Sequence, residues 1–312
     1  NRQPLHSLLE SNNYMSLDQT AHWQKTNLDY DDSEWGHPKY TYTVIDRGHA
    51  LVVELCERLS REQGGSPAIL DIGCGEAPFY DKLGHVNGTY IGVEPSAPLL
   101  QRVESSATKY LIRGSGERLV IADSCIDIAL NIAALDHCLD AEETMRETFR
   151  VLRPGGTALF VLENRGRLSN LLRRALRMEV GHGEEHLYFF DVDDLISLAE
   201  PYGEVSFLRS YGFLLGFDWI GSVFPSRALA VLSATADALM GRLFPKRGQH
   251  FIAAIRKHGH DSEARPLVFI CSTCQTPIEW RRTSCSSCGL NLRWIDGRIL
   301  DALMEEMAGE TP

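Results

Sequence analysis

Two cysteine pairs in the last part of the sequence have the spacing of a metal site. Two residues separate Cys271 from Cys274 and Cys285 from Cys288, and ten residues lie between the pairs. Joined by a short hairpin, two such pairs place four thiolates tetrahedrally, which suits Zn²⁺ in a closed structural site. Iron in the same geometry, two disulfides and chance spacing are the alternatives. Because a short segment buries little core, a metal would supply much of its folding free energy.

A second pattern with chemical meaning is the loop DIGCGEAPF, which contains Asp71, Gly73 and Gly75. Glycines allow a tight turn and let the backbone come close to a ligand. Glu94 closes the next apolar run, about twenty residues on, where a carboxylate accepts hydrogen bonds from both hydroxyls of a ribose. Together these features predict a nucleotide-like ligand. A dinucleotide-binding domain would share both features, and a lone G-x-G also occurs in ordinary strand-to-helix turns.

These residues must be positioned by a regular fold, and the sequence from 66 to 260 alternates strand-like and helix-like segments. Seven short apolar runs are bounded by turn signals: AILDIG, YIGVEP, KYLIRG, IDIALNI, TALFVLEN, EVSFLRSYG and HFIAAIRK. Segments of helical period lie between most of them, such as 141–152, which we expect to end in a turn at RPGG. The pattern predicts an α/β fold with a doubly wound, mostly parallel sheet that binds ligands at the carboxyl ends of its strands.

The order of the motifs carries a family resemblance. D-I-G-C-G, V-E-P, GSGERL, IDIALNIAALDHCLD and FRVLRPGGTALFVLEN follow one another within residues 66–258. This order resembles class I S-adenosylmethionine-dependent methyltransferases, near the group that includes ubiquinone-biosynthesis-type enzymes, and the RVLRPGG turn is among its most specific parts. The resemblance implies a Rossmann-like sheet of seven strands, S-adenosylmethionine as the cofactor, and an enzyme that transfers a methyl group.

The resemblance also implies roles for individual residues. It assigns the cofactor site to residues of the loops that follow the first four strands: Asp71, Gly73, Cys74, Gly75, Glu94, Pro95, Gly116, Glu117, Asn131 and Ile132. The first loop would hold the methionine part, Glu94 the ribose and the third loop the adenine edge, while the fourth loop would lie beside the methyl donor. The chain departs from the family pattern twice. Ala77 replaces the third glycine of the first loop, and Ser115 stands where many relatives have an aspartate that bonds the adenine amine, a bond that a hydroxyl can also accept.

Methyl transfer needs a nucleophile in line with the methyl group and, for some acceptors, removal of a proton. His137, in LDHCLD after the fourth strand, and His186, in GHGEEHLYFF, are the candidate catalytic residues, with His182 a further histidine of that segment. Imidazole titrates near neutral pH, which suits a general base. The alternatives are that these histidines order their loops structurally, or that proximity alone suffices and there is no base.

Two variable regions are candidates for the substrate pocket. Side chains of the N-terminal segment could line a pocket over the methyl donor or pack as a helical cap: Tyr14, His22, Trp23, Trp35, His37, Tyr40 and Tyr42. Arginines after the fifth strand could hold an anionic group or form the solvated face of a helix: Arg165, Arg167, Arg173, Arg174 and Arg177. The apolar stretch 211–244 could form a hydrophobic pocket, a dimer surface or a pair of core helices.

Composition and charge narrow the function classes. We predict an N-terminal helical and aromatic cap at 1–65, a methyltransferase domain at 66–260 and a zinc ribbon at 261–312. The net charge is −11, with 31 Lys and Arg against 42 Asp and Glu, which disfavours a nucleic-acid substrate. No apolar run has membrane-spanning length, and the start of the sequence lacks a signal-peptide pattern. Cys56, Cys74, Cys125 and Cys138 lie in apolar surroundings and are predicted to be buried, reduced thiols, so we expect a cytoplasmic protein. The sequence does not indicate the oligomeric state.

The cysteine-rich segment carries a second resemblance. Its second cysteine pair is followed by a strand and the turn W-I-D-G-R-I-L at 294–300, similar to the small zinc ribbon that activates tRNA and release-factor methyltransferases as a partner subunit. The resemblance implies such a subunit fused in cis, which covers apolar surface of the enzyme or finishes its substrate pocket. We therefore expect methylation at O or N of a small molecule, such as a natural-product intermediate or glycan precursor. The alternatives are an RNA or protein substrate, with the ribbon as docking module, and a cofactor-binding scaffold without catalysis.

Overall fold

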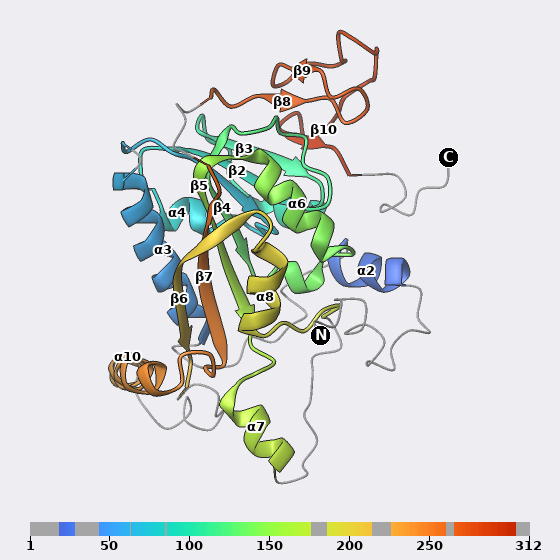
Figure 1. Ribbon diagram of the computed structural model, residues 1–312. Helices are drawn as coiled ribbons and strands as arrows, with labels where there is room; N and C mark the ends of the chain where they lie inside the picture. Colours follow the sequence, from blue (N-terminus) through green and yellow to red (C-terminus); the bar gives the residue numbers. More distant parts are fainter. Residues whose placement is uncertain are drawn as a thin grey trace.

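The computed structural model describes residues 19–28, 44–62, 64–84, 86–175, 186–213, 226–259 and 265–303. Its centre is a nine-stranded mixed sheet in the order β10-β11-β3-β2-β1-β4-β5-β7-β6 (Figure 1). The strands are β1 (Ala68–Ile72), β2 (Thr89–Glu94), β3 (Lys109–Arg113), β4 (Ile126–Ile132), β5 (Leu152–Glu163), β6 (Gly203–Tyr211), β7 (His250–Lys257), β10 (Arg293–Ile295) and β11 (Ile299–Asp301). All seven predicted strands are present. The predicted count of seven is wrong, because β10 and β11 extend the same sheet.

The sheet is mostly parallel, as predicted. Strand β1 is parallel to β2 and β4, and the same direction continues outward through β3 and β5. Strand β7 is antiparallel to both β5 and β6. The strand order reverses between β1 and β4, and such a switch point opens a crevice at the carboxyl ends of the strands. The loops that carry the predicted cofactor residues all leave from this end.

Helices cover both faces of the sheet because the central strands are apolar on both sides. Leu70 packs in one core with helices α6 and α8, whereas its neighbour Ile69 packs in the other core with α3, α4 and α5 (Figure 1). The helices are α2 (Gln19–Asn27), α3 (Val44–Glu62), α4 (Pro78–Lys82), α5 (Ala97–Arg102), α6 (Ala141–Val151), α7 (Leu168–Ala175), α8 (Val192–Ala199) and α10 (Ser226–Leu243), with a 3₁₀ turn η1 (Leu135–His137).

Helix α6 shows how local sequence sets an element. The Asp140 carboxylate caps its start by accepting a hydrogen bond from the Glu143 N–H at 2.9 Å, and Met145 and Phe149 are buried on one face. The helix ends at Val151, as expected. The RPGG residues, however, belong to the first part of β5 rather than to a separate turn, and Gly155 adopts a positive φ of 77° beside a register shift in β4–β5 pairing.

Residues 265–303, which we call the four-cysteine segment, continue the main sheet at its β3 edge. A small hairpin of β8 (Phe269–Ile270) and β9 (Pro277–Ile278) precedes the second cysteine pair. Strand β11 then pairs in parallel with β3, and β10 pairs antiparallel with β11. Asp296 and Gly297 form the tight turn between β10 and β11 with φ values of 52° and 65°, the conformation that Asp-Gly hairpin turns favour. The strand and turn predicted after the second cysteine pair are confirmed, whereas a domain boundary at 260/261 remains a prediction.

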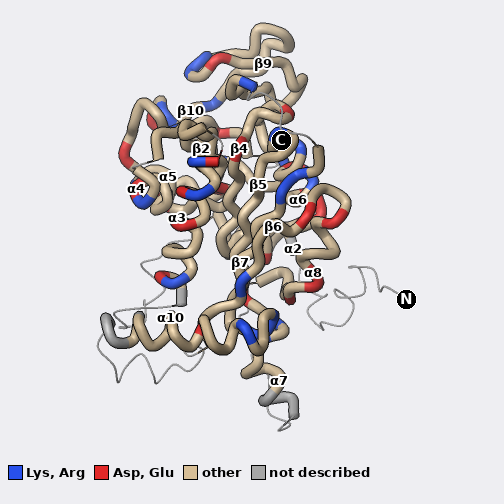
Figure 2. Tube along the Cα trace, turned by 60° about the vertical axis from the view of Figure 1, so that its left-hand side comes forward, with Lys and Arg blue, Asp and Glu red and all other residues tan. Residues whose placement is uncertain are grey.

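The surface of the described residues mixes charges of both signs. Figure 2 shows Lys and Arg interspersed with Asp and Glu along the trace, not gathered into one continuous basic run. Within the part of the chain that the structure describes, no helix combines the length and apolar character needed to cross a bilayer. Cys56, Cys74, Cys125 and Cys138 are buried and unpaired, as expected from their apolar surroundings.

Candidate functional site

A cavity of about 460 Å³ lies at the carboxyl ends of the central strands. That volume falls in the range of ordinary small-molecule sites. Seven predicted site residues line it: Gly73, Gly75, Glu94, Pro95, Gly116, Glu117 and His137. Asp71, Cys74, Asn131, Ile132 and His186 are not among the lining residues. The sheet therefore brings the predicted first, second and third loops together around one space, with His137 at its fourth side.

The glycine loop after β1 is held in place by the end of β2. The N–H groups of Gly73 and Cys74 both donate to the Val93 carbonyl oxygen, at 2.8 and 3.1 Å. The Glu94 carboxylate accepts from the Gly75 N–H at 3.0 Å and from the Ser96 N–H at 2.9 Å. Glu94 is thus both a wall of the cavity and the anchor of the loop, and its carboxylate oxygens keep capacity for further donors.

Glycine is required at the start of this loop, and its absence later has a visible consequence. Gly73 has φ 73°, and a Cβ there would lie 2.5 Å from the Cβ of Ala134, too close to accept. Ala77 stands where the resemblance expects a third glycine and also adopts a left-handed conformation, with φ 55°. The departure at Ala77 therefore leaves the loop shape unchanged, at the cost of some backbone strain.

Asp71 lies beneath the loop rather than in the cavity wall. It is 2% exposed, and its Oδ2 accepts a hydrogen bond from the Tyr90 hydroxyl at 2.5 Å. Burial raises the pKa of Asp71 to about 7, against the opposing effect of the Tyr90 hydrogen bond and with a smaller contribution from the Glu94 charge. Asp71 thus supports the loop from inside the protein, and its predicted role toward the methionine part of a cofactor stays a prediction.

The wall of the cavity at the end of β3 depends on Glu117. Its Oε1 accepts from the N–H groups of Leu139 and Asp140, at 2.7 and 3.3 Å. Its Oε2 is buried and has no hydrogen-bond partner among the described residues. An acceptor of this kind beside Gly116 fits a donor group of a bound ligand. Ser115, the departure from the family pattern, also lines the cavity.

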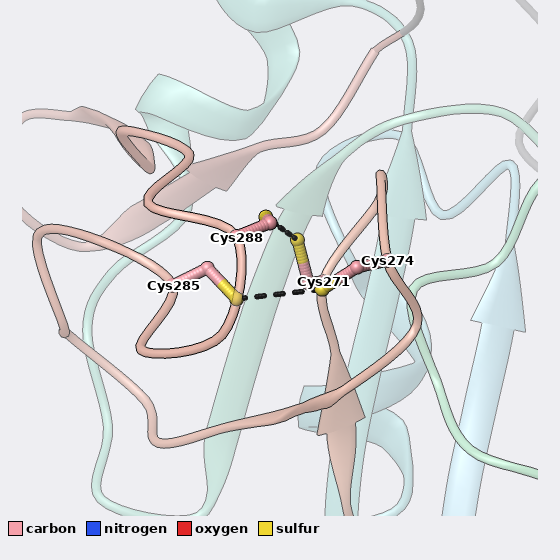
Figure 3. A group of neighbouring side chains, drawn as sticks. All are labelled: Cys271, Cys274, Cys285 and Cys288. Atoms are coloured by element: carbon pink, nitrogen blue, oxygen red, sulfur yellow. Dashed lines mark hydrogen bonds between the residues drawn. The ribbon is translucent and has the colours of Figure 1, made fainter.

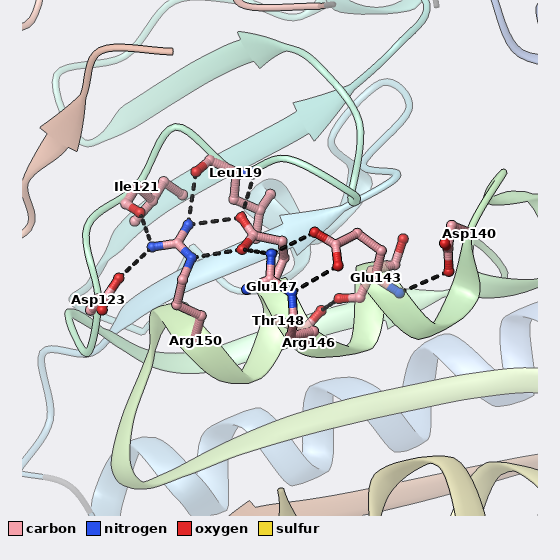
Figure 4. A network of polar contacts seen from close by, with 10 residues as sticks. Leu119, Ile121, Asp123, Asp140, Glu143, Arg146, Glu147, Thr148 and Arg150 are labelled. Carbon is pink, nitrogen blue, oxygen red and sulfur yellow. Dashed lines mark hydrogen bonds and ion pairs between the residues drawn. The ribbon is translucent and has the colours of Figure 1, made fainter. Parts of the chain in front are cut away.

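Residues 118–123, just beyond this wall, are clamped from two sides. On the inside, Arg150 of α6 donates to the carbonyl oxygens of Leu119 and Ile121 at 2.9 and 2.8 Å (Figure 4). On the outside, the Ala122 N–H donates to the Val268 carbonyl oxygen at 2.9 Å. The Arg118 guanidinium also donates to the Ser272 carbonyl oxygen. The four-cysteine segment therefore touches the strip of chain that follows directly on the cavity wall.

The loop after β4 places different residues in the cavity than the resemblance implies. Ala133 and Ala134 line it, whereas Asn131 is 1% exposed and faces inward. The Asn131 side chain accepts from the Leu135 N–H at 2.8 Å and so shapes the turn. Ala133 has φ 52°, an uncommon conformation for a non-glycine residue that nothing in its residue type signals. Asn131 and Ile132 are not among the lining residues, and their predicted place beside the methyl donor stays a prediction.

Helix α2 closes the cavity from the side away from the sheet. Trp23, Lys25, Thr26 and Asn27 line the space, so one of the aromatic residues proposed for a pocket does reach it. Trp23 is buried in a small cluster with Leu303, the end of the four-cysteine segment. His22 is not among the lining residues, and Tyr14, Trp35, His37, Tyr40 and Tyr42 lie outside the described residues. No pattern in the sequence singled out Lys25, Thr26 and Asn27.

His137 and His186 come together although they are far apart in the sequence. Their ring centroids are 4.6 Å apart, and His186 Nε2 lies 3.4 Å from Asp136 Oδ2. The pairing is fixed by the backbone, since the N–H groups of Leu187 and Tyr188 both donate to the Asp136 carbonyl oxygen, at 2.8 and 3.1 Å. His137 faces the large cavity, whereas His186 lies behind it. His182 lies outside the described residues.

The arginines after β5 that the structure describes with side chains are engaged in ion pairs. Arg165 binds the carboxylates of Asp194 and Asp191, at 2.9 and 3.7 Å. Arg167 pairs with Glu163. These contacts fasten the chain after β5 to α8, which is a structural role, and neither arginine lines the large cavity. The side chains of Arg173, Arg174 and Arg177 and the stretch 214–225 lie outside the described residues.

The four cysteines of the C-terminal pairs converge on one point (Figure 3). All four are free, and their sulfur atoms lie within 4.8 Å of one another. Cys271 Sγ is 3.7 Å from Cys288 Sγ, and Cys274 Sγ is 3.6 Å from Cys285 Sγ. A tetrahedral zinc site with Zn–S bonds of about 2.3 Å has sulfur–sulfur edges of about 3.8 Å. These two separations match the edges of such a site, and the four cysteines are free rather than joined in disulfides.

Comparison with known proteins identifies part of the chain. A family model described as a methyltransferase domain matches residues 70–160. Malonyl-[acyl-carrier protein] O-methyltransferase of Pectobacterium atrosepticum is 32% identical over 113 residues, which are 36% of this chain and 44% of that protein. An uncharacterized methyltransferase of Mycobacteroides abscessus is 36% identical over 116 residues, 35% of this chain and 44% of the relative. The chain thus spans less than half the length of the curated relatives it matches.

Solved structures give more distant likenesses. A methyltransferase dependent on S-adenosylmethionine from Archaeoglobus fulgidus aligns with a TM-score of 0.46 at 16% identity, over 67% of this chain and 94% of that chain. The PH0226 protein of Pyrococcus horikoshii aligns with a TM-score of 0.47 at 16% identity, over 73% of this chain and 99% of that chain. A chain from the complex of the Haloferax volcanii Trm112 methyltransferase activator with a methyltransferase aligns with a TM-score of 0.45 at 14% identity. The alignment covers 67% of this chain and 90% of that chain.

The match to the methyltransferase domain covers the sheet side of the cavity. Residues 70–160 contain every lining residue from the loops after β1, β2, β3 and β4. This part of the chain is similar to a methyltransferase domain. Helix α2 and the four-cysteine segment lie outside the matched residues.

Proposed function

We propose that this chain is an S-adenosylmethionine-dependent methyltransferase that methylates O or N of a small molecule, such as a natural-product intermediate or a glycan precursor. The observation that carries the proposal is the glycine loop bonded to Glu94 at the floor of a cavity of about 460 Å³. That arrangement lies wholly within the residues that match a methyltransferase domain.

The residues of the cavity fit this cofactor in type and position. The backbone of Gly73 and Gly75 gives close access to the methionine part, and Glu94 accepts from the ribose hydroxyls. The buried Oε2 of Glu117, which has no partner among the described residues, offers an acceptor at the adenine end. When bound, S-adenosylmethionine supplies a methyl group already activated as a sulfonium. The remaining work of the protein is to place the acceptor in line and exclude competing water.

The acceptor must approach between η1 and α2, because those two elements close the side of the cavity away from the sheet. His137 stands at that side, and we keep it, with His186 behind it, as the candidate residues for handling an acceptor proton. Lys25, Thr26 and Asn27 of α2 would choose among acceptors. One relative is named as an O-methyltransferase of malonyl-[acyl-carrier protein], which supports oxygen as the acceptor atom.

We further propose one structural Zn²⁺ held by Cys271, Cys274, Cys285 and Cys288. Sulfur separations of 3.6 and 3.7 Å match a closed thiolate site, and four thiolates leave no position open for catalysis. The ribbon would then act as an activator subunit fused in cis, because β11 completes the β3 edge beside the cavity wall. We also propose that the enzyme is related to the ubiquinone-biosynthesis group and is located in the cytoplasm. A net charge of −11 makes a nucleic-acid partner unfavourable.

A transfer assay with methyl-labelled S-adenosylmethionine tests the function. The purified chain is incubated with a cell extract that is afterwards separated into small molecules, RNA and protein. We expect label in the small-molecule fraction with the wild type and with Glu76→Ala, a surface change beside the glycine loop, but not with Glu94→Ala. Label in RNA or protein would replace the proposed substrate class. Cofactor binding without label in any fraction would favour the scaffold alternative.

A further inference from the structure

The Asp136, His137 and His186 side chains form a second group of metal-ligand type, separate from the cysteines. One ligand atom from each of the three lies within 4.8 Å of the others. Asp136 and His137 are consecutive on η1, and His186 is brought to them by the two backbone hydrogen bonds onto the Asp136 carbonyl oxygen. The cluster is therefore fixed by main-chain contacts from two separate parts of the chain, which is what a preformed ligand site needs.

The Asp136 carboxylate is the unexplained member of this group. It is 5% exposed, and its Oδ1 is buried without a hydrogen-bond partner among the described residues. The other oxygen lies 3.4 Å from His186 Nε2, a long contact for a hydrogen bond. A buried carboxylate oxygen without a donor is costly, because the water that would solvate it has been removed. A cation beside Oδ1 would supply the missing partner.

We propose that Asp136, His137 and His186 bind one divalent cation of the first transition series, such as Mn²⁺, Fe²⁺, Co²⁺ or Zn²⁺. Two imidazoles and one carboxylate are borderline to hard ligands, and this set leaves coordination positions open, unlike four thiolates. A small cavity of about 10 Å³ beside Asp136 and His186 has room for about one water ligand. Arg165 lines the same small cavity but does not compete for the site, since its guanidinium is held by Asp191 and Asp194.

The place of the cation gives it a use, which rests on the proposed function. His137 also lines the large cavity, so the open positions of a cation bound there face the space where an acceptor must lie. A phenol, enol or carboxylic acid would bind through oxygen, and the positive charge would lower the pKa of its O–H so that the proton leaves to solvent. The oxygen lone pair then forms the bond to the methyl carbon while the carbon–sulfur bond breaks, its electron pair staying on sulfur. The inference thus narrows the acceptor to an acidic oxygen.

Mn²⁺ binding, followed by electron paramagnetic resonance, tests the inference without using activity. Mn²⁺ prefers oxygen and nitrogen ligands, so the thiolate cluster does not interfere when it keeps its own zinc. We expect one Mn²⁺ per chain, bound at least tenfold more weakly by Asp136→Asn, His137→Gln and His186→Gln. His258→Gln is the matched control, because His258 is an exposed histidine outside the cluster. Binding that is absent in the wild type, or equal in all four variants, would overturn the inference.

Cofactor calorimetry on the same samples separates this inference from the proposed function. Retained cofactor affinity in a variant shows that it has folded, so a loss of Mn²⁺ then belongs to the site; His186→Gln serves if Asp136→Asn fails to fold. Cofactor binding without Mn²⁺ binding would leave the methyltransferase proposal standing and remove the cation. Methyl transfer that needs no divalent cation, with an ionisation near neutral pH lost in His137→Gln, would also overturn it in favour of a general base.

Discussion

The loops around the cavity and the four-cysteine segment belong to one sheet but are held in place by different forces. The glycine loop leaves a strand that is buried on both faces, with Leu70 and Ile72 at 0% and 2% exposure. In the four-cysteine segment Cys271 and Cys285 are buried, whereas Cys274 and Cys288 are exposed. Pairing with β3 and a small aromatic cluster also join it to the rest of the chain, together with hydrogen bonds such as that from the Ala122 N–H to the Val268 carbonyl oxygen. Burial on both faces holds the inner region, whereas for the outer region we propose that a metal adds to its packing.

A cluster of aromatic rings packs between β3 and the four-cysteine segment. Trp280 is the hub, since its ring centroid lies 4.9 Å from Tyr110, 4.6 Å from Phe269 and 5.0 Å from Trp294. Of these four rings only Phe269 is fully buried. Edge-to-face pairs of this kind contribute about 1 kcal/mol each beyond area burial. The comparison leads us to expect that the four-cysteine segment, although part of the main sheet, depends on the proposed zinc for its shape.

The largest expected effect is on the outer region. Cys271→Ser combined with Cys274→Ser should remove about one zinc per chain and unfold residues 265–303, because structural zinc contributes on the order of 10 kcal/mol to such sites. Metal analysis and hydrogen exchange of this segment measure the change. Cys56→Ala, in the sheet core, is the control and should keep the metal. A fully protected segment without metal would mean that packing alone holds it.

The next effect concerns pH and the inner region. Burial raises the folded-state pKa of Asp71 from its ordinary value of 3.8 to about 7. The folded state therefore holds this proton to a higher pH than the unfolded chain does, so the free energy of unfolding is highest below pH 3.8 and falls as the pH rises toward 7. Relative to Asp71→Asn, the wild type should therefore lose about 1.4 kcal/mol of unfolding free energy per pH unit in that window. Urea unfolding of both proteins from pH 4 to pH 8 measures the difference. Parallel curves would show that Asp71 stays ionised.

Glu94→Ala tests the cavity directly. Removing the carboxylate takes away the acceptor for the Gly75 and Ser96 N–H groups and for a ribose, so cofactor affinity should fall at least a hundredfold, or about 2.7 kcal/mol. Calorimetric titration with S-adenosylmethionine measures it. Glu76→Ala removes an exposed ion pair with Arg102 next to the same loop and should change the affinity less than twofold. Equal affinities for all three proteins would remove the cofactor assignment.

The smallest effect is at the junction of the two regions. The Arg298 guanidinium donates to the carbonyl oxygens of Val103 and, at 2.6 Å, Gln101, and so ties the hairpin turn to the end of α5. Arg298→Ala should weaken the docking of β11 by about 1–2 kcal/mol. The readout is faster amide exchange in β3, with zinc content unchanged. Arg282→Ala, an exposed arginine of the same segment, should leave β3 exchange as it is.

Sequence patterns predicted the inner region well because its signals are local. Each central strand is a short apolar run ending at Gly73, Glu94 or Gly114, and parallel pairing then forces these ends together. The cysteine spacing likewise predicted a convergence that the structure confirms.

The remainder could not be predicted because it depends on partners far away in the chain. The short sequences of β10 and β11 do not indicate that β11 pairs with β3. Likewise, the residue types of Lys25, Thr26 and Asn27 do not indicate that α2 faces the cavity. Asn131 faces inward and Ala133 has a positive φ, and neither is indicated by the residue type. His186 meets Asp136 only because two backbone hydrogen bonds cross from one loop to another.

The parallel pairing of β11 with β3 has a consequence for synthesis of the chain. Residues 109–113 leave the ribosome long before residues 299–301 exist, so the outer edge of β3 is open during most of translation. An open strand edge recruits other strands, and closing a long loop onto it is slow. If the proposed zinc shapes this segment, metal supply during synthesis would decide whether a new chain closes its own edge. In zinc-starved cells we expect the shortage to appear as aggregated nascent protein, with the molecules that did close showing full activity.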